Sequence, residues 1–342
     1  MLITRTPLRI SFVGGGTDLA DFYMRSVGAV VSMAVNRYFY LSMHQSFSGS
    51  GSLLKYSETE AVTRAQDIRH SILREVFMQY GIENVDFASS ADVPAGTGMG
   101  SSSAFTVGLL NLVYAYQGKY RSQTYLAERA CEIEIRDLGN PIGKQDQYGA
   151  ATGGLKFIQF NPDGQTSVQG LFLKHDERLK LERSLMLFYI GNQRSASTIL
   201  EEQSRRTREN ADTFAILEKM AAQAMALKND ILVDVDAVGD ALRQGWEYKR
   251  ELSGGVSNPV IDGAYEAAMA AGAAGAKLLG AGAGGFLLVY ADPARQDAVR
   301  QALVGLTLHR VRIDQVGTTV IFDDRADIGP DAAVNTVRHG DA

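Results

Sequence analysis

This chain of 342 residues has only one cysteine and no excess of basic charge. The single cysteine, Cys131, excludes an internal disulfide bond and favours a reducing compartment. Lys and Arg number 34 against 39 Asp and Glu, and the net charge of −5 argues against non-specific binding of nucleic acid or anionic membranes. No signal-peptide pattern is present, and the most apolar stretch, 267–291, is interrupted by Lys277 and glycines. We therefore expect a soluble, cytoplasmic protein.

The pattern of apolar residues predicts a fold of mixed helices and strands. Strand and helix periodicities alternate along the chain, and the pattern restarts after about residue 182. The expected elements are strands at 8–13, 29–45, 85–93 and 184–191, and helices at 61–81, 122–139, 195–228 and 235–252. We predict an α+β fold with one domain over 1–182 and a second over 183–342.

Three glycine-rich stretches occur, at 13–18, 93–104 and 280–285. None is a Walker A loop, because that loop needs a lysine before its final Ser or Thr. The letters of 280–285, GAGAGG, match a dinucleotide-binding loop, which follows a strand and opens a helix. Here the stretch is expected to follow a helix and to open a strand, which disfavours a dehydrogenase.

The second stretch, VPAGTGMGSSSA, has the properties of a phosphate-binding loop. Gly96, Gly98 and Gly100 permit positive φ angles and let a ligand approach the main-chain N–H groups. The serines at 101–103 add hydroxyls and the first amides of a helix expected to end before Gly118, where an anion is favoured. The alternative, a plain helix cap, needs only one serine and one glycine.

Phosphoryl transfer also needs an acidic group near the nucleophile. Glu132, Glu134 and Asp137 fall within the predicted helix 122–139, where solvated charges are the ordinary interpretation. Asp146 differs, because glycines at 143, 149, 153 and 154 surround it and predict a loop that a ligand can approach closely.

The three stretches together resemble the motifs of the GHMP kinases (galactokinase, homoserine kinase, mevalonate kinase and phosphomevalonate kinase). PAGTGMGSSSA is similar to their phosphate loop, TPLRISFVGGGTD to their first motif, and KLLGAGAGGFLLVY to their third. The order is the same, and the motifs span residues 6–290. The resemblance implies an N-terminal ribosomal-protein-S5-domain-2-like domain, a C-terminal ferredoxin-like domain, and an active site between them.

The resemblance also implies roles for individual residues. Asp146 matches the catalytic aspartate, and Arg9 matches an arginine that orients it. Ser102 and Glu134 match the Mg²⁺ ligands, while Gly282 would lie near the phosphates and the substrate. The implied ATP-binding residues are Pro94, Gly96, Gly98, Gly100, Ser101, Ser102 and Ser103. The oligomeric state does not follow from these motifs.

The first motif indicates the substrate. Gly15 and Gly16 replace a Glu-His pair of galactokinases, which argues against galactose. The motifs resemble instead those of D-glycero-D-manno-heptose 7-phosphate kinases and the related fucokinase domain. This implies ATP-dependent phosphorylation of the anomeric hydroxyl to the 1,7-bisphosphate, for GDP-heptose and a capsule or lipopolysaccharide.

Substrate contacts are expected in the same motif and beyond it. The expected contacts are Gly15, Gly16, Thr17 and Asp18, with Arg194 as the clamp for the 7-phosphate and Lys144 as the second candidate. Asp18 has an alternative role as the N-cap of a helix at 19–26.

Other functions of this fold stay open. They are a 6-deoxyhexose 1-kinase, a non-catalytic sugar sensor, and a decarboxylase acting on mevalonate diphosphate. Intact Arg9, Ser102 and Asp146 argue against the sensor, and the sequence GGGTD argues against the decarboxylase.

Overall fold

The computed structural model describes residues 1–47, 49–191, 196–253 and 255–324. A large mixed sheet has the strand order β12-β1-β2-β5-β3-β4, with β6 and β7 joined to it through β2. The central strand β2 pairs with β1 along its length, with β6 through its first half and with β5 through its second half. The strands are β1 (Leu2–Val13), β2 (Gly28–Gln45), β3 (Ser52–Lys55), β4 (Thr59–Val62), β5 (Val85–Ala91), β6 (Leu155–Phe160), β7 (Thr166–Gly170) and β12 (Thr319–Asp323).

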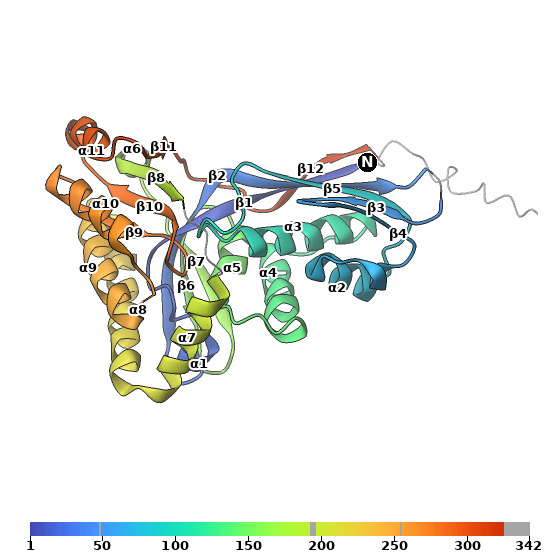
Figure 1. Cartoon of the computed structure of the whole chain (residues 1–342), viewed down its shortest axis with the longest axis horizontal. Helices are drawn as coiled ribbons and strands as arrows, with labels where there is room; N and C mark the ends of the chain where they lie inside the picture. Colours follow the sequence, from blue (N-terminus) through green and yellow to red (C-terminus); the bar gives the residue numbers. More distant parts are fainter. Residues whose placement is uncertain (48, 192–195, 254, 325–342) are drawn as a thin grey trace, which may run out of the picture.

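Helices cover one face of this sheet (Figure 1). α2, α3 and α4 lie beneath β5 and β3, and aromatic and aliphatic side chains such as Phe77, Phe87 and Leu109 are buried between them. The helices in this part of the chain are α1 (Ala20–Tyr23), α2 (Ser71–Tyr80), α3 (Ser101–Tyr116), α4 (Gln123–Cys131) and α5 (Gln145–Ala151).

A smaller antiparallel sheet, in the order β11-β8-β10-β9, forms the second part of the molecule. Its strands are β8 (Leu185–Gly191), β9 (Gly275–Leu278), β10 (Gly285–Tyr290) and β11 (Thr307–His309). The helices of this part are α6 (His175–Ser184), α7 (Ala196–Glu209), α8 (Ala211–Val233), α9 (Ala237–Leu252), α10 (Pro259–Ala270) and α11 (Gln296–Ala302). The α+β prediction is confirmed.

One hydrophobic core joins the two sheets. Leu8 and Ile10 of β1 belong to the same buried cluster as Leu187 of β8 and Leu288 of β10. The chain also returns to the large sheet after the smaller one, because β12 pairs with β1. β1 is therefore fixed on both sides, which suits a strand that carries active-site residues. The domain division at residue 182 stays a prediction.

Several predicted elements differ from the structure. The helix predicted at 61–81 is wrong before Ser71: Thr59–Val62 is strand β4, and the helix ends at Gly81 in the left-handed conformation. The long helix predicted at 195–228 is wrong too, because Asn210 divides it and its side chain accepts hydrogen bonds from the amides of Asp212 and Thr213. Within the described ranges, no helix has the length and apolarity needed to cross a bilayer.

Candidate active site

The phosphate loop adopts the backbone that its glycines predict. Gly96, Gly98 and Gly100 have φ angles of 76°, 81° and 76°. α3 begins directly after Gly100, and no side chain caps it, so the serines at 101–103 leave their first-turn amides without side-chain partners. Pro94 and Gly96 are exposed, as is Ser102. This arrangement disfavours the plain-cap interpretation and leaves N–H groups for an anion.

The third glycine stretch packs directly on the phosphate loop. A Cβ added to Gly98 would lie 2.5 Å from the carbonyl oxygen of Leu279, and one on Gly280 would lie 2.4 Å from the Cα of Gly98. Gly285 meets the carbonyl oxygen of Thr97 in the same way. The stretch follows strand β9 rather than a helix, which corrects that prediction, but it opens a strand as expected. Gly282 packs against the backbone of Val256.

Arg9 and Asp146 form the centre of the site. Arg9 is 3% exposed, and its Nε donates to Asp146 Oδ1 at 2.8 Å while its Nη1 donates to the carbonyl of Gly98 at 2.7 Å. The carboxyl carbon of Asp146 would lie 3.4 Å from a Cβ on Gly100. The structure thus brings three distant motifs, β1, the phosphate loop and α5, to one point.

Asp146 stands in the first turn of α5. The prediction of a loop at this position is wrong, because the short helix is held by tertiary packing instead of by its own sequence. A Cβ on Gly149, one turn later, would lie 3.0 Å from Cγ of Arg9. The absence of a side chain at 149 therefore lets Arg9 lie along α5 and reach Asp146.

Ser102 and Glu134, which the resemblance pairs as metal ligands, are in contact. Ser102 Oγ donates to Glu134 Oε1 at 2.8 Å, and Gln147 Nε2 donates to Oε2 at 2.8 Å. Glu134 lies in a π-helical turn, Glu132–Asp137, that continues α4; such turns often occur at functional sites. Burial is complete and raises the pKa of Glu134 to about 6, although the bonds from Ser102 and Gln147 lower it.

Replacing Glu134 with glutamine is expected to remove a loss of stability that the wild type shows as the pH rises. The folded-state pKa is raised, so the contribution of Glu134 to stability is complete below 4.5 and is lost as the pH rises through about 6. The shift corresponds to about 2 kcal/mol. Urea unfolding measured at pH 5 and pH 8 should show that the free energy of unfolding of Glu134→Gln, relative to that of the wild type, is higher at pH 8 than at pH 5. An equal difference at both pH values would contradict this expectation.

Asp18 connects the first glycine stretch to the segment before Asp146. Its carboxylate accepts hydrogen bonds from the amides of Gly16 and Gln145 and from Nε2 of Gln145, at 2.9 to 3.1 Å. A Cβ on Gly143 would lie 1.9 Å from Oδ2. Burial, and then the nearby Asp146 carboxylate, raises the pKa of Asp18. The N-cap interpretation is wrong, because Leu19 occupies the N-cap of α1.

The other predicted substrate residues have different surroundings. Thr17 is fully buried, and its hydroxyl donates to the carbonyls of Gly14 and Ala29, so it shapes the loop. Lys144 donates to the carbonyl of Gly164 at 2.9 Å and lies 5.0 Å from the ring centre of Tyr23. Arg194 lies outside the described residues.

Two buried lysines beneath the loops were missed by the sequence analysis. Lys249 of α9 donates to the carbonyl of Gly280, and Lys277 of β9 donates to those of Ser11 and Phe12 at 3.0 Å. Burial lowers the pKa of Lys249 to about 7 and the pKa of Lys277 well below its usual value. The only signal in the sequence was a lysine inside the apolar strand 275–278.

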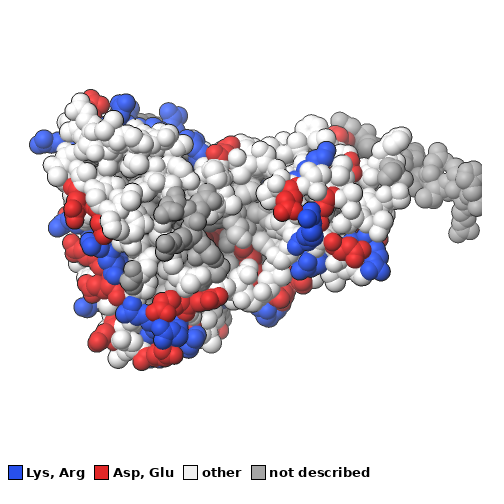
Figure 2. Space-filling model, in the orientation of Figure 1, with Lys and Arg blue, Asp and Glu red and all other residues white. Residues whose placement is uncertain are grey.

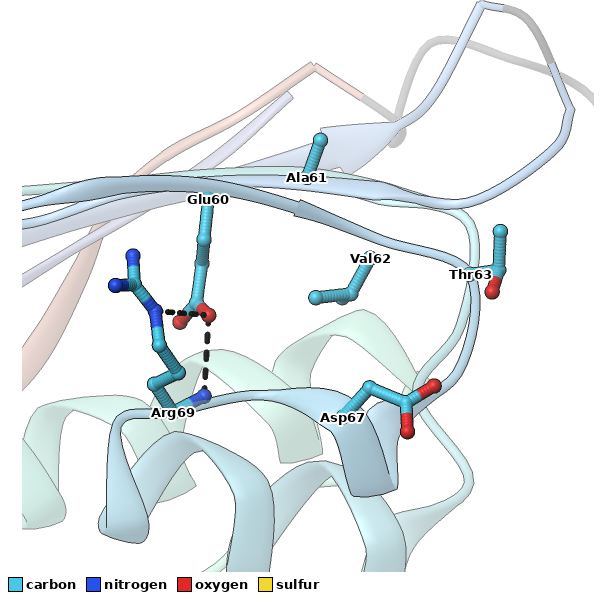
Figure 3. Close-up of a pocket in the computed structure, with 6 residues that line it drawn as sticks. All are labelled: Glu60, Ala61, Val62, Thr63, Asp67 and Arg69. Atoms are coloured by element: carbon cyan, nitrogen blue, oxygen red, sulfur yellow. Dashed lines mark hydrogen bonds and ion pairs between the residues drawn. The ribbon is translucent and has the colours of Figure 1, made fainter.

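The surface and the cavities agree with a site built from backbone. Figure 2 shows charged side chains of both signs gathered along the flanks of the displayed face, with some Asp or Glu atoms also visible near its middle. A cavity of about 440 Å³ lies elsewhere, between β4 and the start of α2, where Glu60 accepts hydrogen bonds from the backbone and side chain of Arg69 (Figure 3). None of the predicted catalytic residues lines it, so the glycine loops are the better candidate.

The glycine loop, the buried arginine–aspartate pair and the serine–glutamate pair offer the kinds of group that phosphoryl transfer needs. The GHMP kinase N-terminal domain matches residues 66–154, and the GHMP kinase C-terminal domain matches residues 216–305. The chain belongs to the GHMP kinases, which transfer a phosphoryl group from ATP.

Individual relatives extend this comparison over most of the chain. The D-glycero-alpha-D-manno-heptose 7-phosphate kinase of Campylobacter jejuni is 28% identical over 88% of this chain and 92% of its own length. The bifunctional fucokinase/GDP-fucose pyrophosphorylase of Arabidopsis thaliana is 24% identical over 87% of this chain and 30% of its own length. A solved D-glycero-D-manno-heptose 1-phosphate kinase from Bacteroides thetaiotaomicron has a TM-score of 0.78 at 22% identity, over 94% of this chain and 99% of that one. That likeness shows the fold.

Proposed function

We propose that this chain is a sugar 1-kinase that phosphorylates the anomeric hydroxyl of D-glycero-D-manno-heptose 7-phosphate. The observation that carries the choice of sugar is the similarity to the Campylobacter jejuni heptose 7-phosphate kinase over nearly the full length of both chains. The Gly15–Gly16 pair supports it, because these positions offer no side chain of the galactokinase type. The product would be the 1,7-bisphosphate, a precursor of GDP-heptose for a surface polysaccharide.

The position of Asp146 beside Arg9 supports this reaction. The anomeric oxygen attacks the γ-phosphorus of ATP, the bond from that phosphorus to the β–γ bridging oxygen breaks, and ADP leaves. Asp146 accepts the proton of the hydroxyl, and Arg9 holds the carboxylate through its Nε contact of 2.8 Å. The amides at the start of α3 bind the phosphates as fixed donors, which need no reorganisation during the reaction.

Magnesium fits the donor set of Ser102 and Glu134. Mg²⁺ prefers oxygen ligands and commonly takes one or two carboxylates from the protein, with phosphates and water completing its shell. Among the described residues, no group of three or more His, Cys, Asp or Glu side chains forms a protein-only metal site. We propose Glu134 and Ser102 as the protein ligands; the bound ion would neutralise phosphate charge.

ADP release measured against a panel of sugars tests the proposal. The panel contains heptose 7-phosphate, heptose 1-phosphate, sedoheptulose 7-phosphate, mannose, fucose, galactose and mevalonate. We expect selective turnover of heptose 7-phosphate, with the new phosphate on C1 by ³¹P NMR. Preference for heptose 1-phosphate or for an unphosphorylated sugar would overturn the heptose 7-phosphate assignment and leave the kinase. The absence of turnover on every sugar would favour a non-catalytic sensor.

A fucokinase-like 6-deoxyhexose 1-kinase is the second candidate. The match to the Arabidopsis thaliana fucokinase over 87% of this chain favours it. Arg194, the proposed clamp for the 7-phosphate, distinguishes the two candidates. In a heptose 7-phosphate kinase, Arg194→Ala should raise KM for the phosphorylated sugar alone, because an unphosphorylated sugar has no group for this arginine to bind.

A further inference from the structure

Two glutamine side chains lie over the Gly15–Gly16 pair. A Cβ on Gly16 would lie 2.3 Å from Nε2 of Gln203, and one on Gly15 would lie 3.6 Å from Nε2 of Gln145. Gln145 comes from α5, next to Asp146, while Gln203 comes from α7 in the second half of the chain. The two carboxamides therefore approach the space that side chains at positions 15 and 16 would fill.

Each carboxamide has a polar atom without a hydrogen-bond partner among the described residues. These atoms are Oε1 of Gln145 and Nε2 of Gln203, and both are buried. Gln203 as a whole is only 5% exposed. Buried polar atoms are nearly always paired in native proteins, so an acceptor beside Gly15 and a donor beside Gly16 indicate that a ligand completes them.

The surrounding charge restricts what this ligand can be. Asp18 accepts hydrogen bonds from the backbone and side chain of Gln145, whereas the carboxylate of Asp146, the next residue, is paired with Arg9. The buried Asp18 carboxylate disfavours a second phosphate beside Gln145, whereas a sugar hydroxyl both donates and accepts and suits this pair of atoms. The neutral polyol part of the substrate therefore fits this place, and its phosphate, if it carries one, belongs elsewhere.

We propose that Gln145 and Gln203 are specificity-determining residues that bind hydroxyls of the sugar close to the reacting one. The proposal rests on the sugar-kinase function proposed above. The φ of +102° favours glycine at position 16, and the Gln203 amide occupies the space beside it. Helix α7 thereby contributes a sugar-binding residue in addition to the glycines of the three motifs.

The test is Gln203→Met, which keeps the length and volume of the side chain and removes its hydrogen bonds. We expect KM for the preferred sugar of the panel to rise about tenfold, with KM for ATP within about twofold of wild type. The matched control is Gln223→Met on α8, where Nε2 donates to the carbonyl of Ala241, away from Gly16. Unchanged sugar KM in Gln203→Met would overturn the proposal.

Two further measurements distinguish this proposal from the proposed kinase function and from a folding defect in the variant. Thermal unfolding with and without the sugar, in the absence of ATP, reports binding without turnover. A sugar-induced rise in Tm in wild type that Gln203→Met loses would support the proposal even if no turnover occurs and the kinase function fails. If Gln203→Met does not fold, Gln203→Asn, which withdraws the amide by one methylene, is expected to weaken sugar binding, and wild-type affinity in that variant would overturn the proposal.

Discussion

Asp146→Asn is expected to lower kcat by about 10²- to 10⁴-fold while the affinity for ATP stays close to that of wild type. Asparagine cannot take up the proton of the attacking hydroxyl. Its amide would also face the Nε and Nη donors of Arg9, both of which now bond to Asp146 Oδ1. A loss of kcat with unchanged affinity for the nucleotide is expected when a side chain stabilises the transition state and does not contribute to binding of ATP.

Steady-state kinetics and calorimetric titration with ATP check this expectation. The matched control is Asp163→Asn, because Asp163 is an exposed aspartate in the turn between β6 and β7 and accepts only a local hydrogen bond from the amide of Gln165. That substitution should leave kcat unchanged. A kcat near the wild-type value in Asp146→Asn would remove Asp146 from its catalytic role.

Gly98→Ala is expected to reduce kcat/KM for ATP on the order of 100-fold. The new methyl group would lie 2.5 Å from the carbonyl oxygen of Leu279 and 2.9 Å from the amide nitrogen of Gly280. Both are backbone atoms, so neither can rotate away as a side chain could. The two glycine loops would have to separate, and the carbonyl of Gly98 that Arg9 binds would move with them.

Gly118→Ala is the control for backbone strain in this experiment. Gly118 also has a positive φ, 69°, but nothing lies within 4 Å of its added Cβ. Placing an alanine at a positive φ angle costs about 1 to 2 kcal/mol in both variants. Only in Gly98→Ala does the methyl group also collide with the backbone of Leu279 and Gly280. Equal kcat/KM values in the two variants, measured alongside Tm, would show that loop contact is not required for nucleotide use.

The buried lysines show where prediction from the sequence ended. A lysine is ordinarily exposed, so Lys249 gave no reason to expect burial, and the apolar surroundings of Lys277 were the one signal for it. Their positions depend on the carbonyls of Gly280, Ser11 and Phe12, which come from other parts of the chain. The helix at Asp146 was missed for a related reason, because seven residues rich in Gly and Ala form a stable helix only when packed.

Local features of this protein were determined by the sequence alone. Glycines at 96, 98 and 100 permit the positive φ angles of this loop, and the serines after them begin a helix whose free amides suit phosphate. The motifs around Arg9, Ser102 and Asp146 also predicted the family, which the comparisons confirm, and the candidate residues of the site.

The relations between those features were decided only by the tertiary structure. The contact of Gly280 with Gly98, the junction of Asp18 with Gln145, and the approach of Gln203 to Gly16 each join segments more than 120 residues apart. Periodicity and propensity describe neighbours along a helix or strand and carry no information about such approaches. The packing of the two sheets around β1 brings these segments together, and their meeting turns separate motifs into one site.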